Sequence, residues 1–361
     1  SLSSPLKGSG LIRGGMNILI VTDAWNPQVN GVVRTLQSVK AEMEKMGHAV
    51  TVISPDQFKS MPCPTYPEIR LALTFSVGKR IMDARPDAIH IATEGPLGVA
   101  ARKFCVKKGL PFTTAYHTQF PEYVSKRTKL PARWFWRYIR WFHAPSKAVM
   151  VSTPAVEAEL HANQIPHTRH WGRGVDLAQF TVEGPRHPKM EGLNHPIQLY
   201  VGRVAVEKNI EAFLRTSHPG TKVVVGDGPA LDKMKAKYPD VRFLGKLGGA
   251  DLSAAYRSAD VFVFPSRTDT FGLVLIEALA TGTPVAAYPV QGPIDVLTEE
   301  VGSMDEDLDA AIAKALTRDR SVCAEYAGHF GWDESARQFL DGLEPIVRAS
   351  ELEEAGLERA R

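Results

Sequence analysis

The sequence predicts an α/β protein with two consecutive doubly wound domains, each built on a parallel sheet covered by helices. Residues 17–53 run from an apolar strand pattern through an amphipathic helix pattern to a second strand pattern, which is a βαβ unit. The same alternation restarts at residue 197. Between the two halves, residues 169–196 are rich in Gly, Pro and His, which is typical of a crossing between domains.

The first half opens with the strand pattern NILIV at residues 17–21. Apolar residues then recur at helical spacing, at Val32, Val33, Leu36, Val39, Met43 and Met46. Gly47 follows as a candidate C-cap, and AVTVIS at residues 49–54 is the next strand. Further strands are expected at 88–92, 111–117 and 148–153, with helices between them. Crossovers between such strands are right-handed, so a parallel sheet is expected.

The second half predicts strands at 197–203, 222–226, 241–245, 260–266 and 284–288. Helices are expected from about residue 209, at 229–238 and at 272–282. A final helix begins near residue 331, with Asp333 as its N-cap. We therefore predict an N-terminal domain at 16–175, a linker at 176–195, a C-terminal domain at 196–330 and a helix at 331–361 that packs back on the N-terminal domain. Residues 1–15 are interpreted as an added leader, and Met16 as the natural start.

Composition narrows the class of protein. The 361 residues are 44% hydrophobic and 23% charged, and no apolar run approaches the roughly 20 residues that span a bilayer. Three separated cysteines argue against a disulfide framework or a zinc site and favour a reducing cytoplasm. The net charge is only +3, but residues 123–156 hold seven basic residues and no acidic ones. A local basic patch predicts an anionic partner surface.

Two groups of residues suggest a diphosphate ligand. Gly31 lies at the start of the first helix, where backbone N–H groups can approach a phosphate, although plain turn chemistry also explains it. Arg203 and Lys208 follow a strand at the carboxyl edge, with Glu207 as the nearby acid; a surface pair is the alternative. The dinucleotide fingerprint is absent, since GDGPAL at 226–231 holds only its first two glycines. A nicotinamide or flavin dehydrogenase is therefore disfavoured.

The stretch SRTDTFGLVLIEALATGTPVAA, residues 266–287, holds two acids eight positions apart. Asp269 precedes a helix start and Glu277 lies one to two turns inside the helix. The first N–H groups of that helix carry the positive end of its dipole, so Phe271 to Val274 are a second anion-binding element. An N-cap role for Asp269 and a solvated face for Glu277 are the alternatives.

Two further features lie in the first half. His117 ends a strand at the carboxyl edge, where ligands bind, although a lone histidine is also compatible with a structural role. Residues 131–143 form a helix on which an arginine stripe is flanked by aromatic residues, with Phe135, Ile139 and Phe142 opposite. Such a helix can lie at a bilayer interface or pack as a core helix with its arginines in solvent. The residues assigned to this surface are Arg133, Trp134, Arg137, Tyr138, Arg140 and Trp141.

Several motifs in one order make the chain resemble a known family. VNGVVRT, YHTQFPEY, GVDLAQF, GRVAVEKN, GDGP, FLG and SRTDTFGLVLIEALATGTPV are similar to those of retaining GT-B glycosyltransferases that use nucleotide-sugar donors. The likeness runs from Met16 to about residue 345. Within that family, TDTFG and RYIRWFH are most similar to bacterial and plant enzymes that glycosylate diacylglycerol or glycolipids. The resemblance implies two Rossmann-like domains facing a central cleft.

The resemblance also assigns roles. It implies that Arg203, Lys208 and the loop glycine Gly31 bind the donor diphosphate, and that His117 lies near the reacting sugar. Glu277 is the second acid of the family's Glu-seven-Glu motif and binds the ribose hydroxyls. Asp269 stands at the first acid position, one methylene shorter than the usual Glu, and contacts the sugar. The other implied donor contacts are Gly202, Gly245, Lys246, Leu247, Thr270, Phe271, Gly272, Leu273 and Val274.

The family mechanism is a front-face displacement in which the leaving phosphate oxygen takes the acceptor proton, with no bound metal and no other cofactor. The first expectation is transfer of a hexose or hexuronic acid from a UDP-sugar to diacylglycerol by an enzyme on the inner face of the cell membrane. The alternatives are a mannosyltransferase that uses GDP-mannose on a glycolipid or soluble acceptor, and a non-catalytic protein that binds nucleotide-sugars. No nucleic-acid partner is expected.

Overall fold

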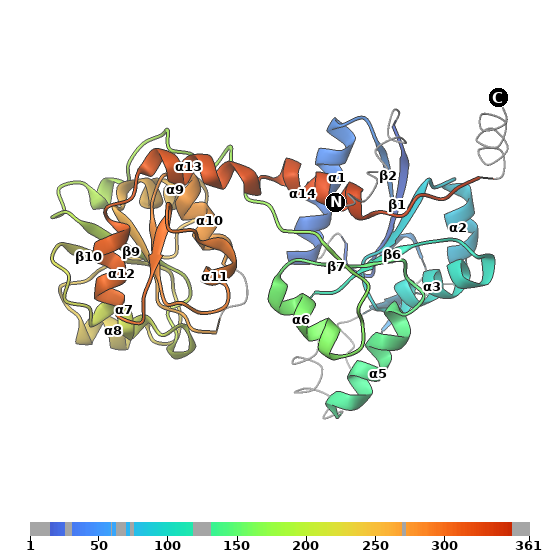
Figure 1. Ribbon diagram of the computed structural model, residues 1–361, viewed down its shortest axis with the longest axis horizontal. Coiled ribbons are helices and arrows are strands. Elements are labelled where there is room, and N and C mark those ends of the chain that lie inside the picture. Colours follow the sequence, from blue (N-terminus) through green and yellow to red (C-terminus); the bar gives the residue numbers. More distant parts are fainter. Residues whose placement is uncertain are drawn as a thin grey trace, which may run out of the picture. The chain divides into compact units, whose positions relative to one another are not determined.

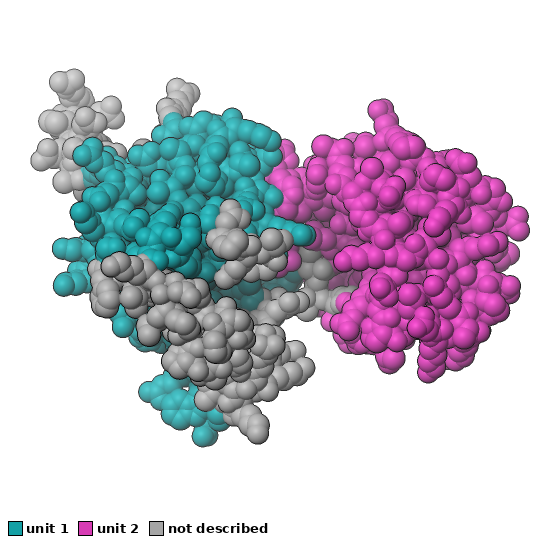
Figure 2. Space-filling model, turned by 180° about the vertical axis from the view of Figure 1, so that it is seen from behind, with its two compact units in different colours: residues 1–172, 335–361 teal, residues 173–334 magenta. Residues whose placement is uncertain are grey.

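The computed structural model describes residues 15–25, 31–58, 60–62, 70–72, 76–117, 131–268 and 272–348. The chain forms two compact units, which Figure 2 colours separately. Unit 1 holds residues 1–172 and 335–361, and unit 2 holds residues 173–334. The chain therefore passes from one unit to the other twice, once after Gly172 and once after Glu334.

Unit 1 is built on a six-stranded parallel sheet with the order β2-β1-β5-β6-β7-β8 (Figure 1). Successive strands alternate with helices, as the sequence predicts. The strands are β1 (Asn17–Val21), β2 (Ala49–Ile53), β5 (Ala88–Ile91), β6 (Thr113–Ala115), β7 (Val149–Val151) and β8 (Thr168–His170). The helices are α1 (Gly31–Lys45), α2 (Val77–Asp83), α3 (Pro96–Lys108), α5 (Ala132–His143) and α6 (Pro154–Ala162), with the short turn η1 (Pro55–Gln57) and the antiparallel pair β3 (Ser60–Pro62) and β4 (Arg70–Ala72).

In the first helix, α1, the apolar residues that recur at helical spacing form the buried face. Val33, Leu36, Val39 and Met43 of α1 are buried, as the helical spacing predicts. The helix ends at Lys45, and Gly47 follows with φ 94°, a left-handed conformation that glycine adopts without strain. Met46 lies beyond the helix end and is exposed.

Unit 2 repeats the design with the strand order β11-β10-β9-β12-β13-β14. All of its strand pairs are parallel. Its strands are β9 (Ile197–Val201), β10 (Thr221–Val225), β11 (Arg242–Gly245), β12 (Val261–Phe264), β13 (Val285–Ala287) and β14 (Gly302–Met304). Its helices and turns are η2 (Pro188–Met190), η3 (Val206–Lys208), α7 (Ile210–Leu214), α8 (Leu231–Lys237), α9 (Gly249–Ser258), α10 (Leu273–Ala280), α11 (Pro293–Val296), α12 (Leu308–Ala315), α13 (Arg320–Ala327) and η4 (Gly328–Phe330).

Two apolar clusters cover the two faces of this second sheet. Leu199, Val223 and Phe262 belong to one cluster. Their chain neighbours Tyr200 and Val224, together with Val261 and Val263, belong to the other. Because successive side chains of a strand point to opposite faces, this division means that both faces of the sheet are buried. Such burial explains why the strands are continuous apolar runs in the sequence.

Residues 176–195, which the sequence predicts as a linker, belong to unit 2. Phe180 and Met190 are buried in its core. Ser253 of α9 donates a hydrogen bond to the Gln179 carbonyl, and His187 N donates to Ser258 Oγ. The segment therefore packs as part of this unit.

The last described helix, α14 (Trp332–Gly342), straddles the second crossing. The sequence predicts Asp333 as its N-cap, but the helix begins at Trp332, so Asp333 lies in its first turn. Within unit 1, Phe339 of α14 is fully buried and packs against the rings of His90, edge-on, and Trp171, tilted, each 4.8 Å away between centroids. Farther on, Ile346 N donates to the Asp87 carbonyl at 2.8 Å.

In each sheet the chain first adds strands on one side of the unit's first strand and then continues on its other side, and the boundary between the two sides is the switch point. In unit 1 this point lies between β1 and β5, and in unit 2 it lies between β9 and β12. Ligands of doubly wound sheets bind beyond the carboxyl ends of the strands at such points. The two switch points are therefore where a functional site is expected.

Candidate active site

Three loops meet beyond the carboxyl ends of unit 2's strands. Gly202 N donates to the Val225 carbonyl at 3.0 Å, and Gly226 N donates to the Gly245 carbonyl at 2.9 Å. Gly226 has φ 144°, and a Cβ there would lie 1.8 Å from the Gly202 oxygen, so only glycine fits. The backbone bonds hold the loops that follow β9, β10 and β11 in one layer.

Arg203 projects from this layer. Its carbonyl accepts a hydrogen bond from the buried Tyr200 hydroxyl at 2.7 Å, which fixes the backbone. Its guanidinium lies 3.8 Å from Glu207, and both side chains are about 60% exposed, at 62% and 60%. An ion pair so exposed holds the arginine weakly, so the charge stays available to an anionic ligand.

Lys208 is half-buried at the end of η3. The next residue, Asn209, adopts the left-handed conformation with φ 56°, and its Nδ2 donates to the Pro265 carbonyl at 3.0 Å. This bond joins the segment after β9 to the end of β12. The predicted basic pair thus lies at the switch point of unit 2 because Asn209 turns the chain there.

Helix α10 begins beside the end of β12. Gly272 is its N-cap, with no side-chain hydrogen bond to the first turn, and Leu273 and Val274 are its first half-buried residues. The predicted contacts Asp269, Thr270 and Phe271 lie outside the described residues. The anion-binding role of this helix start stays a prediction.

Glu277 lies in the second turn of α10 and is half-buried. Its Oε2 accepts a hydrogen bond from the Tyr256 hydroxyl at 2.9 Å. Burial raises the pKa of Glu277 above the ordinary 4.5, and the Tyr256 hydrogen bond opposes that shift. A carboxylate anchored by one oxygen is oriented to accept further hydrogen bonds, as a ribose diol requires.

The predicted base contacts follow β11. Gly245 has φ 74° and turns the chain, Lys246 is exposed, and Leu247 packs partly against the core. They lie at the carboxyl edge beside the loops that carry Arg203. Their contact with the base of a donor stays a prediction.

In unit 1, Gly31 is the first residue of α1 and is exposed. A Cβ built there would meet no atom within 4 Å, and its φ is not left-handed. The packing of the described residues therefore does not require glycine at this position. A close approach by a ligand remains a physical reason for the glycine.

His117 is half-buried two residues beyond β6, at the carboxyl edge of the unit 1 sheet. Its ring lies edge-on to Trp171, 6.4 Å away between centroids. Behind it, His90 is fully buried, and burial together with the charge of His117 lowers the pKa of His90 to about 3. His90 is therefore neutral, and its Nδ1 lies 2.9 Å from the Thr113 hydroxyl.

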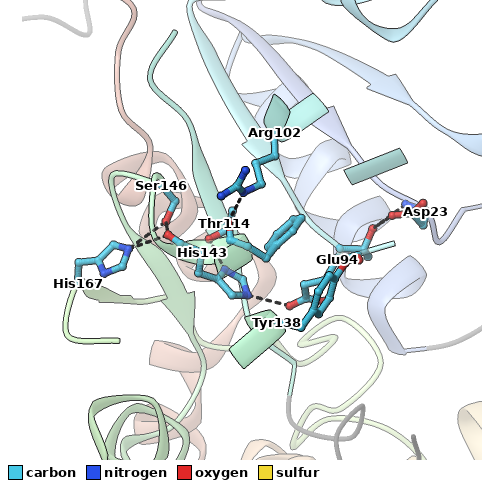
Figure 3. A network of polar contacts seen from close by, with 10 residues as sticks. Asp23, Glu94, Arg102, Thr114, Tyr138, His143, Ser146 and His167 are labelled. Atoms are coloured by element: carbon cyan, nitrogen blue, oxygen red, sulfur yellow. Dashed lines mark hydrogen bonds and ion pairs between the residues drawn. The ribbon is translucent and has the colours of Figure 1, made fainter. Parts of the chain in front are cut away.

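Sequence reasoning missed two carboxylates at the switch point of unit 1 (Figure 3). Asp23 follows β1, and its carboxylate accepts hydrogen bonds from Thr93 Oγ1 at 2.6 Å and from Leu97 N at 2.8 Å. Gly98 N donates to it as well, at 3.2 Å. Burial raises the pKa of Asp23, and these donors oppose the shift. Asp23 therefore holds the first turn of α3 against the end of β1.

Glu94 follows β5 and is the second missed carboxylate. Its Oε1 lies 3.0 Å from Nε2 of the fully buried His143, and its side chain is only 10% exposed. Nδ1 of His143 lies 2.7 Å from the Thr114 hydroxyl. Both Asp23 and Glu94 come two to three residues after a strand end. The carboxyl-edge rule applied to His117 would have found them.

The surface of α5 agrees with the predicted division of its faces. Phe135, Ile139 and Phe142 are buried, whereas Trp134 is 51% exposed and Trp141 is 41% exposed. Arg133 and Arg137 are exposed and lie over the Trp134 ring, 5.9 and 5.7 Å from its centroid. Arg140 is half-buried and Tyr138 is exposed. We call Arg133, Trp134, Arg137, Tyr138, Arg140 and Trp141 the α5 surface.

The last turns of α5 are bonded to the rest of unit 1. The Tyr138 hydroxyl donates to the Glu94 carbonyl, and His143 contacts the Glu94 carboxylate (Figure 3). Arg102 of α3 donates to the carbonyls of Trp141 at 2.6 Å and Phe142 at 3.1 Å, and its guanidinium stacks on the Trp141 ring 3.8 Å away. These contacts join the end of α5 to the switch point of unit 1.

In the part of the chain that the structure describes, no helix is long and apolar enough to cross a membrane. No group of three His, Cys, Asp or Glu residues there is placed to hold a metal ion.

The two doubly wound units are those of the GT-B fold. The Glycosyltransferase Family 4 profile matches residues 29–179, and the Glycosyl transferases group 1 profile matches residues 195–318. Together they match most of the chain, which therefore belongs to these glycosyltransferases. The structure of Anabaena Alr3699/HepE in complex with UDP has the same fold, with a TM-score of 0.63 at 17% identity over 90% of this chain and 99% of that one.

Curated relatives extend over most of the sequence. The chain is 29% identical, over 88% of its length and 96% of the relative, to a GDP-mannose-dependent alpha-mannosyltransferase of Mycobacterium tuberculosis. It is 26% identical, over 83% of its length and 78% of the relative, to the alpha-monoglucosyldiacylglycerol synthase of Streptococcus pneumoniae. The relatives thus include mannosyltransferases and glycolipid glucosyltransferases.

Proposed function

We propose that this glycosyltransferase moves a hexose, with retention of configuration, from a nucleoside-diphosphate sugar to a lipid acceptor at a membrane surface. The observation that carries the proposal is the exposed guanidinium of Arg203, which follows β9 at the β9/β12 switch point. The start of α10, which follows β12, and the anchored carboxylate of Glu277 on that helix add to it. A cation and a helix start suit a diphosphate, and a carboxylate suits a sugar diol.

The proposed reaction breaks one bond, forms one bond and transfers one proton. The bond between the anomeric carbon and the phosphate oxygen breaks, and a bond from the acceptor oxygen to the same carbon forms. The electron pair of the breaking bond stays on the phosphate oxygen, so the diphosphate gains negative charge in the transition state. The acceptor proton then passes to that oxygen. Arg203 and Lys208 stabilise that charge, which is the role that a divalent cation plays in other transferases.

The transfer is therefore proposed to need no bound metal. Turnover in the presence of EDTA should equal turnover in its absence. Activity that is lost with EDTA and restored by Mg²⁺ or Mn²⁺ would contradict this part of the proposal.

For the donor, the similarity to a GDP-mannose-dependent mannosyltransferase favours GDP-mannose. A UDP-sugar, the first expectation from the sequence, is the second candidate. Incubating the protein with GDP-mannose, UDP-glucose, UDP-galactose and UDP-glucuronic acid, each with diacylglycerol, a glycolipid or no lipid, distinguishes them by product mass. A protein that binds these donors but neither transfers nor hydrolyses any of them would be the non-catalytic alternative.

For the acceptor, the α5 surface supports a lipid. Exposed arginines beside exposed tryptophans match the arrangement of an interfacial helix, with arginines at headgroups and aromatic rings at the acyl boundary. The similarity to a diacylglycerol glucosyltransferase points the same way.

Vesicle flotation tests this surface. The variant Arg133→Gln/Arg137→Gln/Arg140→Gln should lose most of its binding to anionic vesicles. The matched control is Lys103→Gln/Lys107→Gln/Lys108→Gln, which removes the same charge from exposed residues of α3 in the same unit and should retain binding. Equal binding by both variants would rule out the α5 surface.

Replacing Arg203 tests the catalytic part. Arg203→Ala should lower kcat by about 100-fold or more, because the leaving diphosphate loses a stabilising cation in the transition state. The control is Arg215→Ala, an exposed arginine of unit 2 outside the proposed site. A near-normal kcat for Arg203→Ala would overturn the proposed role.

A further inference from the structure

Unit 2 contains a second basic site, at the opposite end of its strands from the proposed donor site. A cavity of about 440 Å³ is lined by Arg186, Arg257, Arg320 and Ser321, among others. Arg257 lies in the last turn of α9, the helix that leads into β12. Thr281, which also lines the cavity, is the C-cap of α10, the helix that leads into β13. The cavity therefore opens at the amino-terminal edge of the sheet, whereas the proposed donor site lies at the carboxyl edge.

Two of its three arginines are built into the fold. Arg257 is only 8% exposed and donates to the carbonyls of Pro185 and Thr181, each at 3.1 Å. Arg320 donates to the Ala259 carbonyl at 2.7 Å and, at 3.3 Å, to the Arg257 carbonyl. These bonds hold both guanidinium groups in place beside the cavity.

The acceptors of these bonds are neutral. None of the residues that line the cavity is acidic. Among the described residues, no carboxylate lies within ion-pair distance of Arg186, Arg257 or Arg320. The nearby acids are engaged elsewhere, since Asp260 pairs with His195 at 2.6 Å and Asp319 caps α13. Carbonyl oxygens accept hydrogen bonds from Arg257 and Arg320 but carry no negative charge that would pair with either guanidinium.

Such an arrangement favours an anion. Burial lowers the pKa of Arg320, the charge of Arg186 lowers it further, and Asp260 opposes the shift. Charges removed from water without a partner are costly, and an anion that enters the cavity relieves that cost through charge-assisted hydrogen bonds. The volume exceeds the roughly 30 Å³ share of one water many times, so a phosphate group and part of a small molecule fit.

We propose that this cavity binds the phosphate group of a small metabolite, at a site separate from the donor site. Arg257 and Arg320 form its fixed wall. Arg186 is exposed at the rim of the cavity, where its side chain can turn toward the bound anion.

The test must silence the donor site first, because that site also binds phosphates under the proposed function. Inorganic phosphate and pyrophosphate are titrated by calorimetry into the full chain carrying Arg203→Ala/Lys208→Ala, at constant ionic strength. Phosphate should still bind. Adding Arg186→Gln should weaken binding at least tenfold, and Arg186→Glu should abolish it.

Arg215→Gln is the matched control, since it removes an exposed arginine of the same unit outside the cavity. It should leave binding unchanged. Absence of phosphate binding in the double variant, equal binding with Arg186→Glu, or equal weakening by Arg215→Gln would each overturn the proposal. Thermal unfolding without phosphate checks that every variant is folded. The donor-site proposal is decided separately, by the turnover of Arg203→Ala.

Discussion

Gly31 is a position where the fold and the proposed function make different demands. No described atom lies within 4 Å of a Cβ built there, and the residue begins a helix. Gly31→Ala should therefore leave the free energy of unfolding unchanged or raise it by about 0.5–1 kcal/mol, since alanine is the better helix former. If a phosphate approaches the backbone at this point, turnover should fall at the same time.

Urea unfolding and steady-state kinetics measure these two quantities on the same protein. The informative result is their separation, with stability kept and activity lost. If the variant keeps both stability and turnover, Gly31 serves only the turn before α1. If it loses both, the added methyl group makes a steric clash.

Glu277 predicts a pH dependence of donor binding. Its burial raises its pKa above 4.5, so the carboxylate is protonated at a higher pH than that of an exposed glutamate. A ribose diol donates hydrogen bonds to the carboxylate form. Donor affinity should thus fall as pH decreases through this raised pKa, and the fall in affinity should begin at a higher pH than it would for an ordinary glutamate.

Calorimetric Kd values against pH provide the measurement. Glu277→Gln should weaken donor binding by roughly 10-fold or more and remove this pH dependence, because hydrogen bonds to a charged group contribute about 1.5–3 kcal/mol. Glu299→Gln removes an exposed acid of the same unit and should change neither quantity. An unchanged pH profile in Glu277→Gln would contradict the ribose role.

Among the elements, α5 combines an exposed basic and aromatic face with an anchored end. Its last residue, His143, is fully buried between the Glu94 carboxylate and the Thr114 hydroxyl. The Tyr138 hydroxyl and Arg102 add further bonds to the same turns. The helix therefore presents its surface from a fixed position.

Removing Glu94 tests that anchor. Glu94→Ala leaves buried His143 without its carboxylate and should lower the free energy of unfolding by about 1–3 kcal/mol. Glu94→Gln keeps a polar partner for His143 Nε2, so it should lose less. Equal stability of the alanine and glutamine variants in urea would contradict the anchoring role.

For the whole molecule, the two crossings of the chain place residues 335–348 in unit 1 although they follow unit 2 in the sequence. Phe339 is fully buried between His90 and Trp171. Phe339→Ala should destabilise unit 1 by about 3–5 kcal/mol through the cavity it leaves.

Hydrogen exchange followed by mass spectrometry locates that effect. Faster exchange is expected in the strands of unit 1, with unit 2 unchanged, because both apolar clusters of the unit 2 sheet lie wholly within residues 173–334. Equal acceleration in both units would show that their stabilities are coupled.

Much of this architecture could be predicted from local patterns. The βαβ alternation, the helix that buries Val33 and Leu36, and the restart at residue 197 depend on side-chain periodicity, which follows from backbone geometry alone. The three faces of α5 are another example, since 100° per residue places Phe135 and Ile139 opposite the arginines. The family motifs also indicated the glycosyltransferase class from the sequence, because each motif is a short, contiguous stretch that can be recognised without the fold.

Contacts between distant segments required the folded chain. Asp23 meets Leu97, Glu94 meets His143, and Phe339 meets His90, each pair separated by many residues. The segment 176–195 has the composition of a linker, yet its few apolar residues are buried in the core of unit 2. Its carbonyls also accept hydrogen bonds from Arg257. The basic cavity of unit 2 likewise gathers arginines from three separate segments. Periodicity describes which face of an element is apolar, but the neighbours of that face depend on strand order, and strand order is a property of the whole chain.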